Sequence, residues 1–163
     1  MELDLARLLE VLYRHRVDYV LIGGLAAVYH GSPFPTEDAD ITPAIGEANL
    51  ERLSDALAEL NARIRTDAVP EGQPFSHDAT SLAAARVWNL MTDAGDLDLS
   101  FEPNGTTGYP DLVRDAERAA LYDVQVRIAS LADIIRSKQA ANRPKDQRVL
   151  PTLRELLAQR RGA

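Results

Sequence analysis

Apolar residues recur along this chain with two periods, and these periods predict its helices and strands. A spacing of three or four residues is typical of an amphipathic helix, because it places the apolar side chains on one face. This spacing, with some shorter helix-compatible runs, predicts helices at 3–13, 25–29, 47–62, 79–84, 111–118 and in the C-terminal region 130–161. Short alternating or continuous apolar runs predict strands at 18–22, 38–41, 87–92, 96–102 and 124–128.

The order of these elements predicts an α/β or α+β fold. Helices and strands alternate along most of the chain, which is typical of a mixed β-sheet flanked by helices. The strands at 87–92 and 96–102 are joined by a short turn and are expected to form an antiparallel hairpin. Residues 67–78 and 104–110 contain proline and glycine and are expected to be loops.

Length and composition limit the class of protein. A chain of 163 residues without cysteine has neither disulfides nor a thiolate zinc site, yet it is long enough to bury a core of its own. No linker divides it, so residues 1–163 are expected to form one domain, with a core at about 15–128 and C-terminal helices at about 130–161. The sequence shows no signal-peptide pattern and no apolar stretch of membrane length, which predicts a cytoplasmic protein without a membrane partner.

The first candidate for chemistry is a glycine pair, Gly23-Gly24, between the strand at 18–22 and the helix at 25–29. Glycine tolerates unusual backbone angles, so a turn from strand into helix through two glycines lets backbone N–H groups approach a phosphate. The positive end of the helix dipole lies behind these groups. The pair is therefore a candidate phosphate-binding turn, although by itself such a pair more often forms only a tight turn.

Two aspartates follow on the next strand, in the sequence Asp38-Ala39-Asp40-Ile41. Side chains alternate between the faces of a strand, so Asp38 and Asp40 share one face, about 7 Å apart along the strand. Two carboxylates on one face are suited to hold divalent cations. Acidic proteins also carry such pairs on solvated strands, so the pair is informative only together with the glycine turn and a later aspartate.

The glycine pair, thirteen further residues and Asp38-x-Asp40 together resemble the nucleotidyltransferase superfamily that shares the polymerase-β catalytic core. The sequence at 35–41, Pro-Thr-Glu-Asp-Ala-Asp-Ile, is most similar to the abortive-infection (AbiEii) and MenT-type toxin nucleotidyltransferases. The resemblance implies a single nucleotidyltransferase domain of the minimal polymerase-β type. It also implies a third carboxylate on a later strand.

The strand at 96–102 offers this third carboxylate. Its leucines alternate with acidic residues, so the acidic side chains are expected to share one face. In the family, the third aspartate lies between two apolar residues of such a strand. This comparison favours Asp98 and leaves Asp96 as the alternative.

The first C-terminal helix carries a second set of candidates. Lys138 lies on the apolar face of this helix, where a lysine either reaches an anion or extends to solvent. The toxin family has a similar lysine ahead of an Arg-x-Lys-Asp sequence, matched here by residues 143–146. The resemblance implies that Lys138 binds the triphosphate and that Arg143, Lys145 and Asp146 belong to the nucleotide site with Gly23-Gly24. Asp146 is suited either to orient a basic side chain or to cap the last helix.

Charge is unevenly distributed along the chain. The net charge is −7, but residues 134–163 carry eight basic and two acidic side chains, and the remainder carries ten basic and twenty-three acidic ones. An acidic body with a basic C-terminal region is what an anionic ligand, either a nucleotide or an RNA backbone, requires beside a metal site.

The reaction implied by the resemblance is metal-dependent transfer of a nucleoside monophosphate from an NTP to an acceptor hydroxyl, with release of pyrophosphate. Asp38, Asp40 and Asp98 are expected to hold two Mg²⁺ ions, with Mn²⁺ as the alternative metal. These three aspartates and Lys138 form the expected catalytic set.

The basic C-terminal region favours an RNA acceptor. The leading hypothesis is therefore a toxin of a toxin–antitoxin system that modifies the tRNA 3′ end and has a cognate antitoxin as a partner. A small molecule or a protein hydroxyl (AMPylation) remains an alternative acceptor, as does a catalytically inactive, antitoxin-like binding module. Phe34 and Val149 stand where many relatives have an arginine and an acidic residue. These departures concern the substrate more than the metal chemistry.

Overall fold

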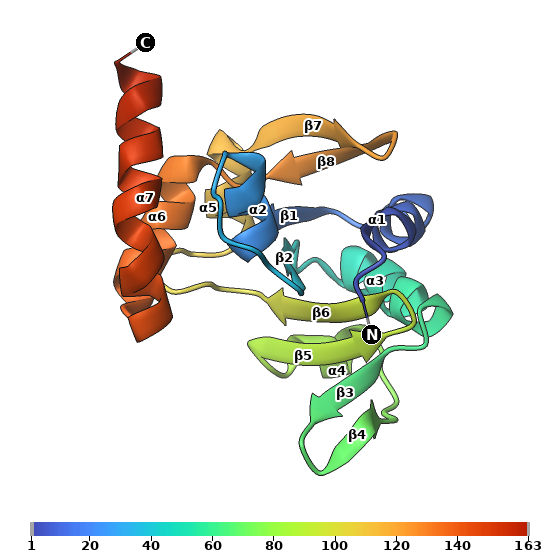
Figure 1. The fold of residues 1–163 in the computed structure, drawn as a ribbon. Coiled ribbons are helices and arrows are strands. Elements are labelled where there is room, and N and C mark those ends of the chain that lie inside the picture. Colours follow the sequence, from blue (N-terminus) through green and yellow to red (C-terminus); the bar gives the residue numbers. More distant parts are fainter. Residues whose placement is uncertain (1, 163) are drawn as a thin grey trace.

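The computed structural model describes residues 2–162, which form a mixed eight-stranded sheet with seven helices around it (Figure 1). The strand order is β4-β3-β5-β6-β2-β1-β8-β7. The strands are β1 (Tyr19–Ile22), β2 (Ala39–Pro43), β3 (Arg63–Thr66), β4 (Val69–Gln73), β5 (Val87–Thr92), β6 (Gly95–Ser100), β7 (Glu117–Leu121) and β8 (Val124–Ile128). The helices are α1 (Leu5–Arg14), α2 (Gly23–Tyr29), α3 (Glu47–Glu59), α4 (Ala79–Ala83), α5 (Tyr109–Asp115), α6 (Leu131–Ala141) and α7 (Pro144–Arg161). The mixed sheet flanked by helices confirms the fold class expected from the sequence.

The centre of the sheet places strands that are distant in sequence side by side. The pairs β2–β6 and β1–β8 are parallel, and the other neighbours are antiparallel. The helices form two groups: α3 contacts α1 and α4, and α6 contacts α2 and α7. Trp88 of β5 donates a hydrogen bond to the Leu82 carbonyl in α4 (3.0 Å), which places the first group on the opposite face of the sheet from Asp40 and Asp98. None of the helices within 2–162 is long and apolar enough to span a bilayer.

The apolar period determines the core. The leucines of α3 expected on one face, Leu50, Leu53 and Leu57, are almost fully buried, as are Leu97 and Leu99 of β6. Each side chain of this size stabilises the fold by about 1.5–3 kcal/mol when it leaves water. The same alternation that buries the leucines of β6 turns Asp96, Asp98 and Ser100 to the other face.

A buried amide joins α3 to the strands of the candidate site. Asn49 is 4 % exposed, and its Oδ1 accepts a hydrogen bond from the Asp18 N–H (2.7 Å). Its Nδ2 donates to the carbonyls of Asp18 (2.9 Å) and Ala44 (2.8 Å). Because these residues lie just before β1 and just after β2, one satisfied side chain fixes both strands relative to α3.

Two sequence predictions of local structure were wrong, and one strand was not predicted. The expected loop at 67–78 contains β4, which pairs with the unpredicted strand β3. Proline and glycine in β4 indicated a break, but β4 is an edge strand, where a missing backbone donor is tolerated. The helix expected at 111–118 ends at Asp115 and is followed by β7, whose pairing with β8 overrides the weak strand propensity of its alanines.

Candidate active site

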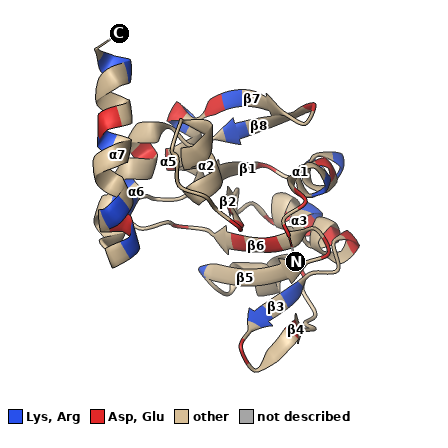
Figure 2. Ribbon diagram, in the orientation of Figure 1, with Lys and Arg blue, Asp and Glu red and all other residues tan. Residues whose placement is uncertain are grey.

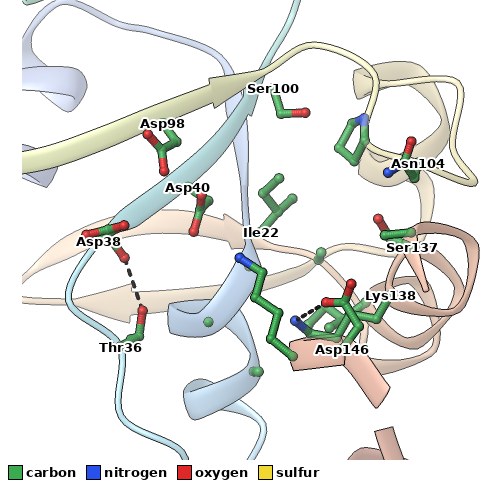
Figure 3. A pocket seen from close by; sticks show the side chains of 18 of the residues that line it. Ile22, Thr36, Asp38, Asp40, Asp98, Ser100, Asn104, Ser137, Lys138 and Asp146 are labelled. Atoms are coloured by element: carbon green, nitrogen blue, oxygen red, sulfur yellow. Dashed lines mark hydrogen bonds and ion pairs between the residues drawn. The ribbon is translucent and has the colours of Figure 1, made fainter. Parts of the chain in front are cut away.

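Three carboxylates gather where β2 and β6 run side by side. These strands are parallel neighbours with Asp40 opposite Asp98, and Asp38 immediately precedes β2. Figure 3 shows the three side chains on one side of a cleft. Asp96 lies two residues earlier on β6, so it is not opposite Asp40. The structure thus brings together the three aspartates chosen from the sequence, and it favours Asp98 over Asp96.

The charges of these aspartates oppose one another. Burial and the negative charges of Asp98 and Asp38 raise the pKa of Asp40 to about 7, and the charge of Lys145 offsets only part of this effect. Burial also raises the pKa of Asp98, against the hydrogen bond and positive charge of Arg65. The positive charges of Lys145 and Arg65 therefore balance the cluster only in part, and a bound cation would relieve the remaining repulsion.

The glycine pair makes room for the carboxylates. Gly23 has a φ of +68°, and a Cβ atom there would lie 2.4 Å from Oδ2 of Asp40. A Cβ at Gly24 would lie 2.7 Å from Oγ1 of Thr36, whose hydroxyl donates to the Asp38 carbonyl (3.4 Å). The N-terminal turn of α2 can therefore approach the aspartates only because both positions lack side chains.

The cleft in front of the aspartates has a volume of about 860 Å³. This is within the range of small-molecule sites, roughly 300–1,000 Å³. Its opposite wall is formed by α6 and the start of α7, where Figure 3 shows Lys138 and Asp146. Arg143 and Lys145 also line the cleft. The two sets of candidates from distant parts of the sequence thus face one shared cleft.

Asp146 organises the basic wall. Its side chain is fully buried, and it contacts Lys138 Nζ (3.7 Å) and Arg143 Nε (2.8 Å). It also accepts a hydrogen bond from the Arg143 N–H (3.1 Å), which caps α7. Burial alone would raise the pKa of Asp146, but the hydrogen bonds from Arg143 and the charges of Arg143 and Lys138 lower it. Asp146 therefore both orients basic side chains and caps the helix, the two roles that the sequence left open.

Some basic side chains of the C-terminal region are already paired with acidic side chains of the protein. Arg136 bonds to Asp111 and Asp133, each at 3.0 Å. Arg160 lies 3.8 Å from Glu117. Figure 2 shows the basic positions spread along α7 and not confined to its cleft end. The net charge of this region therefore overstates the positive charge available to a ligand.

Arg65 is a site residue that the sequence analysis missed. It lies on β3, and its Nη2 donates to Oδ1 of Asp98 (2.7 Å) while Nη1 lies 3.5 Å from Oδ2 of Asp96. The segment Arg63-Ile64-Arg65-Thr66 does alternate polar and apolar residues. That alternation was the available signal, but it is too short to identify a strand without its partners.

The carboxylates fit a divalent cation by their chemistry, because carboxylate oxygens are preferred ligands of Mg²⁺ and Mn²⁺. As they stand, however, no three Asp, Glu or His side chains within 2–162 are assembled into a coordination site. Asp98 is instead hydrogen-bonded to Arg65.

Comparison with known proteins places this arrangement in a recognised fold. No family model and no curated protein sequence matches the chain. Among solved structures, the lincosamide antibiotic adenylyltransferase LnuA with lincomycin bound is similar, with a TM-score of 0.61 and 14% identity over 94% of this chain and 96% of that one. The chain has the nucleotidyltransferase fold.

Two further structures of this fold are similar over nearly the whole chain. A candidate nucleotidyltransferase from Thermotoga maritima aligns with a TM-score of 0.53 and 17% identity over 95% of this chain and 91% of that one. The antibiotic-resistance factor ANT(2'')-Ia aligns with a TM-score of 0.54 and 17% identity over 96% of this chain and 88% of that one. At these identities the likeness shows the fold alone, so activity has to be argued from the site.

Proposed function

We propose that this protein is a metal-dependent nucleotidyltransferase, which transfers a nucleoside monophosphate from an NTP to an acceptor hydroxyl and releases pyrophosphate. The observation that carries the proposal is the meeting of Asp38, Asp40 and Asp98 in a cleft whose opposite wall holds Lys138 and Lys145. Carboxylates on one wall and ammonium groups on the other are suited to divalent cations and a polyphosphate, respectively.

Each group has a role in this proposal. Asp38, Asp40 and Asp98 would hold two Mg²⁺ or Mn²⁺ ions. Bound ions of this kind lower the pKa of an attacking hydroxyl and neutralise charge on the transferred phosphate. Lys138, fixed by Asp146, and Lys145 would bind the triphosphate and hold its leaving group in line.

Arg143 and the glycine pair complete the proposed nucleotide site. Arg143 is half exposed at the start of α7, so its guanidinium can bind a phosphate while it remains bonded to Asp146. Gly23 and Gly24 keep the backbone of α2 close to the aspartates, where added side chains would collide with Asp40 and Thr36. We propose that the two glycines, by lacking side chains, let a phosphate approach the wall of the cleft that carries the aspartates.

For the acceptor, we propose the tRNA 3′ end, as in a toxin that acts with a cognate antitoxin. The support is the set of exposed basic side chains on α7, Lys145, Arg148 and Arg154, of which Lys145 lines the cleft. Phosphate contacts of this kind position an RNA without reading its sequence.

A small hydroxyl-bearing molecule is the second candidate acceptor. The arginines that line the cleft on the β3–β5 side are already paired, Arg65 with Asp98 and Arg86 with Glu102 (2.8 Å). This side therefore presents little free positive charge to an RNA backbone. Two of the similar solved structures belong to an antibiotic adenylyltransferase and an antibiotic-resistance factor.

The test is transfer of label from each of the four NTPs, α-labelled, to total tRNA, to total protein or to a panel of hydroxyl-bearing antibiotics, with and without Mg²⁺. Wild-type protein should label one acceptor class only when metal is present. Lys138→Ala should raise the NTP concentration required, whereas Arg154→Ala should weaken the use of tRNA and leave the NTP requirement unchanged. Absence of transfer to every acceptor, including proteins, would contradict the proposal and indicate a catalytically inactive binding module.

A further inference from the structure

Arg65 reaches the carboxylates through the ordinary alternation of side chains across the sheet. Ile64 of β3 is paired with Leu90 of β5, and Asn89 of β5 is opposite Asp98 of β6. Arg65, the residue after Ile64, therefore shares the sheet face of Asn89 and Asp98. Here the side chain lies across β5, where its Nη1 donates to the Leu90 carbonyl (3.2 Å), and ends at Asp98 on β6.

The guanidinium is shared between two carboxylates. Its Nη2 is 2.7 Å from Oδ1 of Asp98 and its Nη1 is 3.5 Å from Oδ2 of Asp96. Among the ion pairs of residues 2–162, Arg65 is the one cation within 4.0 Å of any of the three site aspartates. Its side chain is 31% exposed, so the guanidinium has a route away from Asp98 towards solvent.

We propose that Arg65 is an internal counter-ion, which neutralises Asp98 in the metal-free protein and is displaced from it when a divalent cation binds. The inference rests on the proposed function, because it assumes that Asp98 is a metal ligand. Asp96 is the second anchor of the guanidinium, so Arg65 stays attached to β6 after it leaves Asp98. This arrangement also gives Asp96 a role that does not include metal binding.

The displacement has a consequence for metal affinity. The guanidinium of Arg65 competes with an incoming metal ion for the carboxylate oxygens of Asp98. After the metal has bound, the nearby positive charge of the guanidinium still repels it. Removal of one unit charge roughly 6 Å from a divalent ion changes its affinity by about tenfold even at the dielectric constant of water. Arg65 therefore keeps the metal affinity low and the metal-free site stable.

The experiment measures Mn²⁺ binding without nucleotide, by paramagnetic resonance of the free ion, for the wild type and for Arg65→Gln. Glutamine keeps hydrogen-bonding capacity and loses the charge. Arg86→Gln is the matched control, since Arg86 lines the same cleft but pairs with Glu102. We expect Arg65→Gln to bind Mn²⁺ about tenfold more tightly, and Arg86→Gln to bind it like the wild type.

The metal dependence of thermal unfolding supplies a second readout, because a merely structural ion pair would stabilise the protein equally with and without metal. Without metal, Arg65→Gln should unfold at a lower temperature than the wild type, because Asp98 has lost its counter-ion. Saturating Mn²⁺ should remove most of this difference, and Arg65→Gln combined with Asp98→Asn should restore the stability of the metal-free protein. These results follow because a bound ion stabilises the folded state in proportion to its affinity.

Two failures are distinguishable. If the wild type binds Mn²⁺ and Arg65→Gln binds it no more tightly, with equal loss of stability with and without metal, Arg65 is only a structural ion pair and the inference is wrong. If neither protein binds Mn²⁺, the metal site of the proposed function is itself wrong, and the inference is overturned with it.

Discussion

At the scale of single residues, Asp40 is the central member of the candidate site. Asp40→Ala should abolish metal-dependent transfer, because it removes a carboxylate that is proposed to bind the metal. It should leave the fold intact, because the side chain faces the cleft and its loss relieves the repulsion from Asp98 and Asp38. Activity with saturating Mg²⁺ and thermal unfolding measure the two effects.

Asp98→Asn should also be inactive, whereas Asp96→Asn should retain transfer. Loss of transfer in Asp96→Asn alone would mean that Asp96 is the third ligand.

Gly23 tests how closely α2 must approach the aspartates. Gly23→Ala forces a side chain into a positive-φ position and directs its Cβ at Oδ2 of Asp40, 2.4 Å away. We expect a loss of about 1–3 kcal/mol in unfolding free energy from the backbone conformation, together with displaced carboxylates and much slower transfer. Gly46→Ala is the control, since a Cβ there meets no atom within 4 Å. Equal activity of both variants would contradict the importance of this close approach.

At the scale of elements, the junction of α6 and α7 depends on a buried carboxylate with a lowered pKa. A lowered pKa in the folded state stabilises the protein above the unfolded pKa of aspartate, about 3.9, and this contribution disappears as the pH falls through the folded value. Asp146→Asn should therefore cost about 1–3 kcal/mol at neutral pH, and the difference from wild type should shrink below about pH 4.

Urea unfolding of both proteins between neutral and acidic pH measures this difference. The exposed turn residue Asp67, replaced by Asn, is the control and should behave like the wild type at each pH. A wild-type advantage over Asp146→Asn that does not change with pH would show that the ion pairs with Arg143 and Lys138 contribute little.

The β7–β8 hairpin offers a change that should stabilise the protein. Its two-residue turn, Tyr122-Asp123, has φ angles of +49° and +65°, which are unfavourable for these residues and suit Asn-Gly. Tyr122 is 66% exposed, so little packing is lost on its replacement. Tyr122→Asn with Asp123→Gly should raise the unfolding free energy by about 1 kcal/mol and leave transfer unchanged. Urea unfolding checks the gain, and a decrease would indicate that Tyr122 makes a contact of its own.

At the scale of the whole molecule, the distribution of charge decides the acceptor. Binding of tRNA through several phosphates should weaken steeply with salt, with a log–log slope of roughly −0.7 per contact on a single strand. A small acceptor should show little dependence, because the arginines on its side of the cleft are already paired. Acceptor affinity measured from low to moderate salt separates the two. A flat response with tRNA would remove it as the acceptor.

The spacing of apolar residues along the sequence correctly predicted several elements and the faces that they bury. The periodic leucines of α3 and the alternation in β6 gave the correct elements and the correct buried faces, because burial of apolar side chains dominates there. The alternation also placed Asp38 with Asp40 and turned Asp98 away from the core. The glycine pair was predicted to bind phosphate, and the structure adds a steric reason for it beside Asp40.

The remaining features depend on contacts between distant parts of the chain. The sequence alone left Asp96 and Asp98 as alternatives, and only the parallel register of β2 against β6 places Asp98 opposite Asp40. β7 and the β3–β4 hairpin exist because of their neighbours in the sheet, and with that hairpin comes Arg65. The pairing of β2 with β6 links backbone groups that are far apart in sequence, so no local pattern encodes it. The sequence thus determined which side chains carry the charge, and the tertiary structure decided which of them meet.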